Sequence, residues 1–163
     1  LGNAVYKQLI AATRATGAQV VCDFEGQTLI DSLEFNPQLV KPNNHELGEI
    51  FGAELKKREE VIPYAKKLQE KGAKNVLVSM AGEGAVLIDE NGREYMSPVP
   101  KGKVVNAVGA GDSMVAGFMA GYMEKEDYLH AFHMGIAAGS ASAFSENLAT
   151  REEIASVYEQ ITK

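Results

Sequence analysis

The segment NAVGAGDSM, residues 106–114, places a carboxylate where a helix is expected to begin. Gly109 and Gly111 leave backbone N–H groups open to close approach by a ligand, and the N-terminus of a helix attracts anions. Asp112, in the first turn, either caps this helix or stands beside a bound anion and accepts a proton from an attacking hydroxyl. The spacing alone leaves both interpretations open.

The glycine spacing excludes two common phosphate-binding motifs. A dinucleotide-binding fingerprint needs a glycine three residues after its second one, and Met114 occupies that position. A P-loop needs Gly-Lys-Ser/Thr at the start of the helix, whereas this chain has Gly111, Asp112 and Ser113 there. A phosphate site at this turn therefore belongs to another class.

The segment KPNNHE, residues 41–46, is a second candidate. Asn43 and Glu46 are three residues apart, so they share one face of the helix that is expected to follow. This spacing is typical of a capping box, but the same pair could hold a water-coordinated Mg²⁺, which takes few protein carboxylates and fills its shell with phosphate oxygens. Lys41 is placed to reach a nucleotide phosphate.

The segment SMAGEG, residues 79–84, directly follows the apolar run NVLV. In open α/β sheets, ligands bind at loops that follow the carboxyl ends of parallel strands. The segment is therefore either a ligand-binding loop or an ordinary turn into the next strand.

The segment GIAAGSASAFS, residues 135–145, is rich in small side chains on an expected helix. Such residues let a neighbouring helix pack closely, or let a flat ring lie against the helix. Close packing is the more common reason for this composition.

The elements that must position these segments alternate along the chain, which predicts an α/β fold with a largely parallel sheet flanked by helices. We expect residues 1–163 to form a single domain. The apolar spacing predicts helices over 4–16, 26–35, 44–52, 59–72, 112–123, 126–145 and 150–163. It predicts strands over 18–24, 37–43 and 74–80, a hairpin over 84–99 that turns at Asn91-Gly92, and a short extended piece over 103–108.

The composition of the chain argues against some classes of binding partner and some locations. The 163 residues carry a net charge of −6, which argues against nucleic-acid and membrane-surface binding. The single cysteine, Cys22, cannot form an intrachain disulfide, which fits a reducing cytoplasm. We expect no signal peptide and no membrane span, since no apolar run is long enough.

Taken in order, the motifs KPN-x-x-E, S-x-x-G-x-G, NAVGAGDSM and GIAAGSA resemble the carboxyl-terminal half of the ribokinase/phosphofructokinase-B family of sugar kinases. The stretches over 20–47 and 137–154 further resemble bacterial 1-phosphofructokinases. The resemblance covers essentially the whole chain. It implies a ribokinase-like fold and ATP-dependent phosphoryl transfer to a sugar phosphate.

The resemblance also implies roles for single residues. Asp112 matches the catalytic base, and the N–H groups of Gly109, Ala110 and Gly111 match the anion hole that steadies the transferred phosphoryl. Lys41 and Asn43 match nucleotide-phosphate contacts, and Asn43 with Glu46 matches the motif that tunes Mg²⁺. The remaining nucleotide-binding positions match Ser79, Gly82, Glu83 and Gly84 in the loop and Ile136 and Ser140 along the adenine pocket.

The implied reaction converts fructose 1-phosphate to fructose 1,6-bisphosphate, with tagatose-6-phosphate kinase as the alternative. Members of this family are longer, so the resemblance implies that the amino-terminal half, with its lid and most sugar contacts, is absent. Full-length relatives are expected to be dimeric. We expect the isolated chain to have little or no kinase activity and to need a partner fragment or associate with itself. A nucleotide-binding module without catalysis and a structural fragment with relic motifs remain open.

Overall fold

The computed structural model describes residues 2–163. The chain divides at Met96 into two compact units, and Ser97–Lys163 is the second. Each is described by itself below. Among the residues that the structure describes, no helix combines the length and the apolar character needed to cross a membrane.

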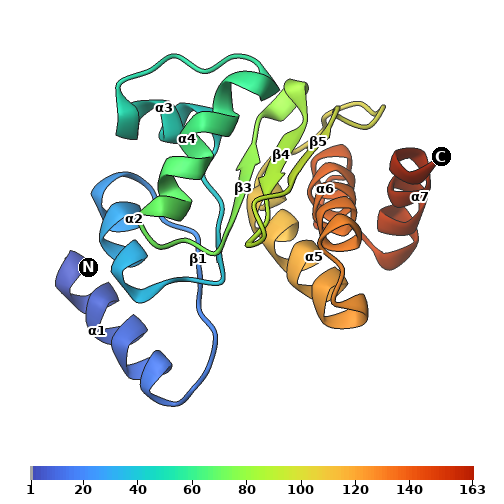
Figure 1. The fold of residues 1–163 in the computed structure, drawn as a ribbon. Coiled ribbons are helices and arrows are strands. Elements are labelled where there is room, and N and C mark those ends of the chain that lie inside the picture. The colour runs from blue at the N-terminus through green and yellow to red at the C-terminus, as the bar shows by residue number, and fades with distance from the viewer. Residues whose placement is uncertain (1) are drawn as a thin grey trace. The chain divides into compact units, whose positions relative to one another are not determined.

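The first unit carries most of the sheet (Figure 1). Its helices are α1 (Asn3–Ala15), α2 (Gly26–Ser32), α3 (Asn44–Phe51) and α4 (Arg58–Glu70), with the short 3-10 helices η1 (Leu33–Phe35) and η2 (Ala81–Glu83). Its strands are β1 (Val21–Cys22), β2 (Leu39–Val40), β3 (Asn75–Ser79), β4 (Ala85–Ile88) and β5 (Glu94–Ser97), whose last residue begins the second unit. The described strands lie in the order β1-β2-β3-β4-β5.

The sheet is mixed. β1 pairs with β2 and β2 with β3 in parallel, with Cys22 opposite Val40 and Val40 opposite Val76. β3 pairs with β4 in antiparallel register, and β4 and β5 form the predicted hairpin, in which Gly92 adopts a φ of 78° at the turn. The parallel strands therefore end at one edge, which is where ligands bind in α/β sheets.

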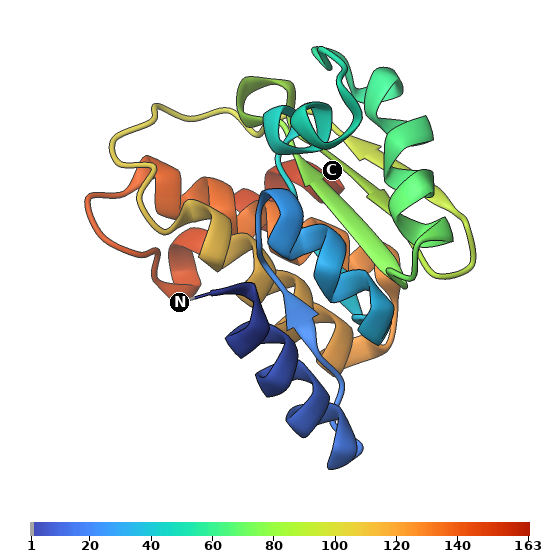
Figure 2. The same cartoon turned by 90° about the vertical axis from the view of Figure 1, so that its left-hand side faces the viewer.

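The core of this unit lies between the sheet and its helices. Val76 and Val78 on β3 and Val86 on β4 are fully buried, and so are Val61 and Leu68 on α4. Figures 1 and 2 show α4 running along these strands. The burial of each of these aliphatic side chains stabilises the folded state by about 1.5–3 kcal/mol relative to leaving it in water.

Cys22 is the one thiol of the chain, and it lies in this core on the edge strand β1. It exposes 1% of its surface, and this burial raises the pKa of the thiol above its usual value. The cysteine is thus protonated and shielded at neutral pH.

The second unit is helical, with α5 (Ala110–Lys125), α6 (Tyr128–Phe144) and α7 (Arg151–Thr162). Thr150 caps α7 in the predicted capping box with Glu153. Glycines lie where α5 meets α6: a Cβ built on Gly117 would stand 2.6 Å from the carbonyl oxygen of Met134, and one on Gly135 would stand 3.0 Å from that of Met114. Close helix packing therefore accounts for the small residues of α6.

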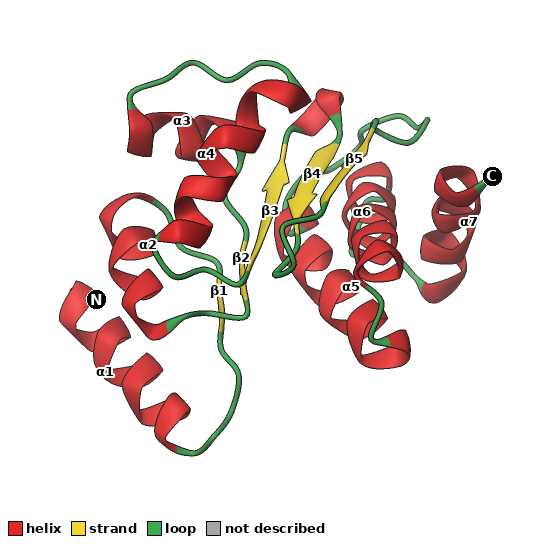
Figure 3. Ribbon diagram, in the orientation of Figure 1, coloured by secondary structure: helices red, strands yellow, loops and turns green. Residues whose placement is uncertain are grey.

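Several predicted elements differ from the structure. The strands predicted over 18–24 and 37–43 are only two residues long. Residues 103–108, predicted as a short extended piece, form no strand and are drawn as a loop in Figure 3. This loop instead ends against α6, because the N–H groups of Val105 and Asn106 both donate to the carbonyl of Ala143, at 2.8 and 3.1 Å. The helix predicted over 112–123 begins two residues earlier, since the left-handed Gly109 (φ 77°) is its N-cap.

Candidate functional site

A polar residue lies at or just after the end of each of the three parallel strands in the first unit. Asp23 comes after β1, Lys41 after β2, and Ser79 is the last residue of β3. Asn43 and Ser79 are paired in an isolated parallel bridge, and the N–H of Ser79 donates to the carbonyl of Pro42 at 3.1 Å. The predicted segments 41–46 and 79–84 therefore lie side by side at the carboxyl edge of the sheet.

Asn43 and Glu46 form the capping box of α3. Oδ1 of Asn43 accepts the N–H of Glu46 at 2.8 Å, and Oε2 of Glu46 accepts the N–H of Asn43 at 2.8 Å. The capping interpretation is confirmed, and it fixes both side chains in place. Within the described chain no hydrogen bond or ion pair uses the second carboxylate oxygen of Glu46, so this oxygen is available to a cation.

A magnesium ion fits this arrangement only if the protein supplies part of its coordination shell and other groups supply the rest. No group of three or more His, Cys, Asp or Glu side chains in residues 2–163 is placed to hold a metal ion. Mg²⁺ usually keeps several waters and is bound through one or two carboxylates plus substrate phosphates. Glu46 and Asn43 therefore suit an ion that arrives with a nucleotide.

Lys41 is buried, with 8% of its surface exposed, and its Nζ lies 3.3 Å from Oδ1 of Asp23. Taking an ammonium out of water is costly unless it is paired, so Asp23 is what permits this lysine to sit at the strand edge. Sequence reasoning missed Asp23. Its signal was its place directly after an apolar strand, the same signal that marked Ser79.

The loop after β3 is wound into a tight turn. The N–H of Glu83 donates to the carbonyl of Met80 and the N–H of Met80 to that of Gly84, both at 2.9 Å. Gly84 adopts φ 94° and ψ −129°, which favours glycine, and Ala81 has a φ of 45°. A Cβ placed on Gly82 would meet nothing within 4 Å, so the backbone is open to a ligand at that point.

In the second unit, the start of α5 presents open amides. In the part of the chain that the structure describes, no acceptor engages the N–H groups of Gly109, Gly111 and Asp112. The N–H of Ala110 is different, since it donates to the carbonyl of Ala107 at 3.2 Å. The first amides of a helix lack intrahelical acceptors, so this turn can hold an anion.

Asp112 does not cap α5, so the capping interpretation of this residue was wrong. The N-cap is Gly109, and α5 has no side-chain cap. The Asp112 side chain is exposed, and among the described residues it makes no hydrogen bond or ion pair. Its carboxylate is consequently free to accept a proton from a bound hydroxyl.

Ile136 and Ser140, matched to the adenine pocket, lie one turn apart on the same face of α6. Ile136 exposes 2% of its surface, and Ser140 is half-buried. Their assignment as adenine contacts stays a prediction.

Comparison with curated proteins finds sugar-phosphate kinases. The 1-phosphofructokinase of Bacillus subtilis is 49% identical over 152 residues, which are 93% of this chain and 50% of that protein. The D-tagatose-1-phosphate kinase of Bacillus licheniformis is 34% identical over 145 residues, covering 88% of this chain and 47% of that protein. The chain spans about half the length of these curated relatives.

Solved structures share the fold. A crystal structure of phosphofructokinase-2 from Escherichia coli, in complex with substrates and products, has a TM-score of 0.91 at 30% identity and covers 100% of this chain and 54% of its own. Ribokinase from Arabidopsis thaliana, complexed with ribose and ATP, has a TM-score of 0.80 at 22% identity, covering 97% of this chain and 53% of its own. The fold is therefore ribokinase-like. A family model described as pfkB family carbohydrate kinase matches residues 1–155, and the chain belongs to that family.

Proposed function

We propose that this chain carries the nucleotide-binding and phosphoryl-transfer residues of an ATP-dependent kinase that converts fructose 1-phosphate to fructose 1,6-bisphosphate. The observation that carries the proposal is the pairing of segments 41–46 and 79–84 at the carboxyl edge of the sheet. Identity of 49% with a 1-phosphofructokinase supports the choice of substrate.

In the proposed reaction the sugar hydroxyl attacks the γ-phosphorus of ATP, and the bond from that phosphorus to the ADP oxygen breaks. Asp112 accepts the proton that the hydroxyl releases. The open amides at the start of α5 hold the charge of the transferred phosphoryl, because phosphoryl transfer depends chiefly on positioning and charge stabilisation. Gly109, Ala110 and Gly111 are the residues we assign to this anion hole, and the N–H of Ala110 must leave the Ala107 carbonyl to take part.

The first unit supplies the phosphate and loop contacts in this proposal. Lys41 and Asn43 bind the phosphates, and the loop 79–84 binds the nucleotide through Ser79, Gly82, Glu83 and Gly84. Ile136 and Ser140 of α6, in the second unit, are the residues we assign to the adenine. Asn43 and Glu46 hold Mg²⁺, which when bound neutralises phosphate charge.

A tagatose phosphate is the second candidate substrate. The relative from Bacillus licheniformis is a D-tagatose-1-phosphate kinase at 34% identity, whereas we predict tagatose 6-phosphate as the alternative. Fructose and tagatose phosphates are both ketohexose phosphates. We therefore treat the ketohexose phosphate as the substrate class and fructose 1-phosphate as the preferred member.

The activity of a whole kinase is also part of the proposal, since the chain spans about half of its relatives. We propose that residues 1–163 are one nucleotide-binding and catalytic portion of a cytoplasmic enzyme, and that this portion alone turns over little or no substrate. In a complete protein, dimers are the expected assembly. The chain alone is expected to bind a partner segment or itself.

Calorimetric titration of Mg·ATP into the purified chain tests the nucleotide site. We expect saturable binding that is abolished by EDTA and largely kept by Asp112→Asn. Asn43→Ala should weaken affinity about 10-fold through a lost charge-assisted hydrogen bond and lower the free energy of unfolding by about 1 kcal/mol through the lost cap. Asn43→Ser keeps a capping hydroxyl, so it should weaken binding without destabilising α3.

Catalysis is tested by supplying the remaining half of the Bacillus subtilis relative and assaying fructose 1-phosphate, tagatose 1-phosphate and tagatose 6-phosphate. Asp112→Asn should lower turnover by about 10²–10⁴-fold. A folded chain that shows no affinity for Mg·ATP would contradict the proposed function, as would full turnover by the Asp112 variant.

A further inference from the structure

Arg58 occupies a position that helix energetics do not explain. It is the first residue of α4, where the positive end of the helix dipole disfavours a cation. Glu59 and Glu60, the next two residues, are the acidic side chains expected there. A guanidinium at this position therefore has a reason outside its own helix.

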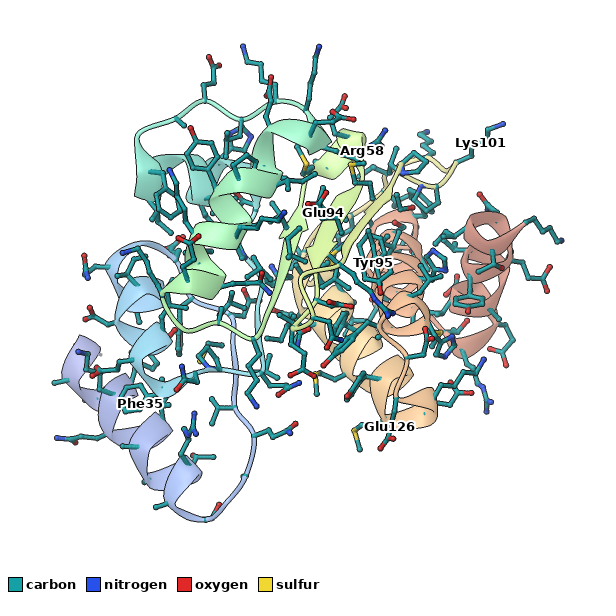
Figure 4. All side chains as sticks on the ribbon, in the orientation of Figure 1. Phe35, Arg58, Glu94, Tyr95, Lys101 and Glu126 are labelled. Atoms are coloured by element: carbon teal, nitrogen blue, oxygen red, sulfur yellow. The ribbon has the colours of Figure 1, made fainter. Side chains whose placement is uncertain are left out.

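That reason is a contact with the loop after β3. Nη1 of Arg58 donates to the backbone carbonyl of Glu83 at 2.7 Å, across 25 residues of sequence. Figure 4 shows Arg58 at the end of α4, close to the connection between β3 and β4. The internal hydrogen bonds of the loop use the carbonyls of Met80, Ala81 and Gly84 as acceptors, so the turn leaves those of Gly82 and Glu83 over, and Arg58 satisfies that of Glu83.

The loop needs such a support. Ala81 has a φ of 45° and Gly84 a φ of 94°, and backbone in sparsely populated regions persists only where surrounding contacts determine it. Gly82 and Glu83, between these two residues, are exposed. Among the described residues, Arg58 provides the one side-chain hydrogen bond to the carbonyl of Glu83.

The charge of Arg58 is also uncompensated. In residues 2–163 no carboxylate forms an ion pair with this guanidinium, whereas Lys41 is paired with Asp23. A hydrogen bond from an ionised donor is shorter and stronger than one from a neutral donor, so this contact fixes the Arg58 side chain against the loop.

We propose that Arg58 is a positioning residue for the nucleotide loop: its bond to the Glu83 carbonyl holds residues 81–84 in the conformation that receives ATP. The inference rests on the proposed function, because the loop is the nucleotide loop only if the chain binds a nucleotide. It adds a residue from a different helix, outside every motif that the sequence offered.

Two measurements on the 163-residue chain test the inference. Arg58→Ala should weaken Mg·ATP binding about 10-fold, which is the effect of losing one charge-assisted hydrogen bond. Arg58→Lys can still donate to the carbonyl and should recover binding to within about 3-fold of the unmodified chain. Lys71→Ala removes a cation from the other end of the same helix and is the matched control, with affinity unchanged.

Amide hydrogen exchange provides a readout that needs no nucleotide. In Arg58→Ala the amides of Glu83 and Gly84 should exchange about 10-fold faster, while those of Val76 and Leu77 on β3 keep their rates. Faster exchange throughout β3 would mean general destabilisation and would overturn the positioning role.

The two proposals fail in different ways. A folded, unmodified chain that does not bind Mg·ATP would overturn the proposed function. A chain that binds, together with an Arg58→Ala variant that binds equally well, would overturn only the role of Arg58.

Discussion

Lys41 and Asp112, the two charged residues central to the proposed chemistry, have opposite surroundings. Lys41 is buried and paired with Asp23, and Asp112 is exposed and unpaired within the described chain. A phosphate contact gains from a fixed ammonium, whereas a base must stay accessible to its substrate. The environments thus agree with the roles we propose.

We predict that Asp23→Asn lowers the free energy of unfolding by about 1–3 kcal/mol, since it leaves a buried ammonium without its counterion. Urea unfolding measures the change. Lys41→Met removes the buried charge itself, so the double variant should lose less stability than the sum of the two single variants.

The exposed ion pair between Lys66 and Glu94 is the matched control for this cycle. Surface pairs contribute about 0–1 kcal/mol, so Lys66→Ala should change stability little. An Asp23→Asn variant as stable as the Lys66 variant would contradict the view that Asp23 compensates Lys41.

Among the helices, the contact between α5 and α6 depends on glycines, which have no side chain to hold the two backbones apart. Gly117 and Gly121 on α5 face Met134 of α6, and Gly135 and Gly139 on α6 face Met114 of α5. Small residues on both helices let the two backbones approach closely. The start of α5, which carries the open amides, is held at one end of this contact, because a Cβ on Gly139 would lie 3.0 Å from the Ala110 carbonyl oxygen.

We predict that Gly117→Ala destabilises the chain although alanine is the better helix former. The gain in helix propensity is about 1 kcal/mol, but the new Cβ would lie 2.6 Å from a backbone oxygen and must push the helices apart. Overpacking costs about 1–3 kcal/mol, so we expect a net loss. Ala120→Ser, on the exposed face of α5, should lower the thermal midpoint only slightly, through the lower helix propensity of serine. A Gly117→Ala variant that melts higher would refute this account.

Much of the secondary structure could be predicted from the sequence. Apolar periodicity placed the helices, and the Asn43 and Thr150 capping boxes marked two helix starts correctly. The start of α5 was placed too late because a left-handed glycine, and not an aspartate, is its N-cap. Arg58 could not be found, since its partner is a carbonyl 25 residues away and carbonyls carry no residue-specific signal.

At the scale of the whole molecule, stability should depend on pH through His133. Burial, and then the charge of His130, lowers the pKa of His133 below its ordinary value of 6.5. Its neighbours include Asp127, the N-cap of α6, and Tyr158 on α7. The unfolded chain therefore binds a proton at His133 more readily than the folded chain, and the folded state loses stability as the pH falls below 6.5.

We predict that the free energy of unfolding, measured by urea titration between pH 7 and about pH 5, decreases toward acid and that His133→Gln reduces this slope. Glu60 and Glu153 act in a lower window, because backbone hydrogen bonds lower their pKa values below 4.5. Their stabilisation is present above that value and is lost as the pH falls through the lowered pKa. Equal slopes for the variant and the unmodified chain would exclude His133 as the cause.

The buried thiol of Cys22 on β1 also provides a built-in probe of how often this edge of the sheet opens. Cys22 lies opposite Val40, the residue that precedes Lys41, so a fluctuation that uncovers the sulfur also loosens the strand end beside the candidate site. A thiol reagent can reach it only during such openings, because the closed sheet shields it. The rate of chemical labelling of Cys22 then measures how often this edge of the sheet opens, without an engineered label.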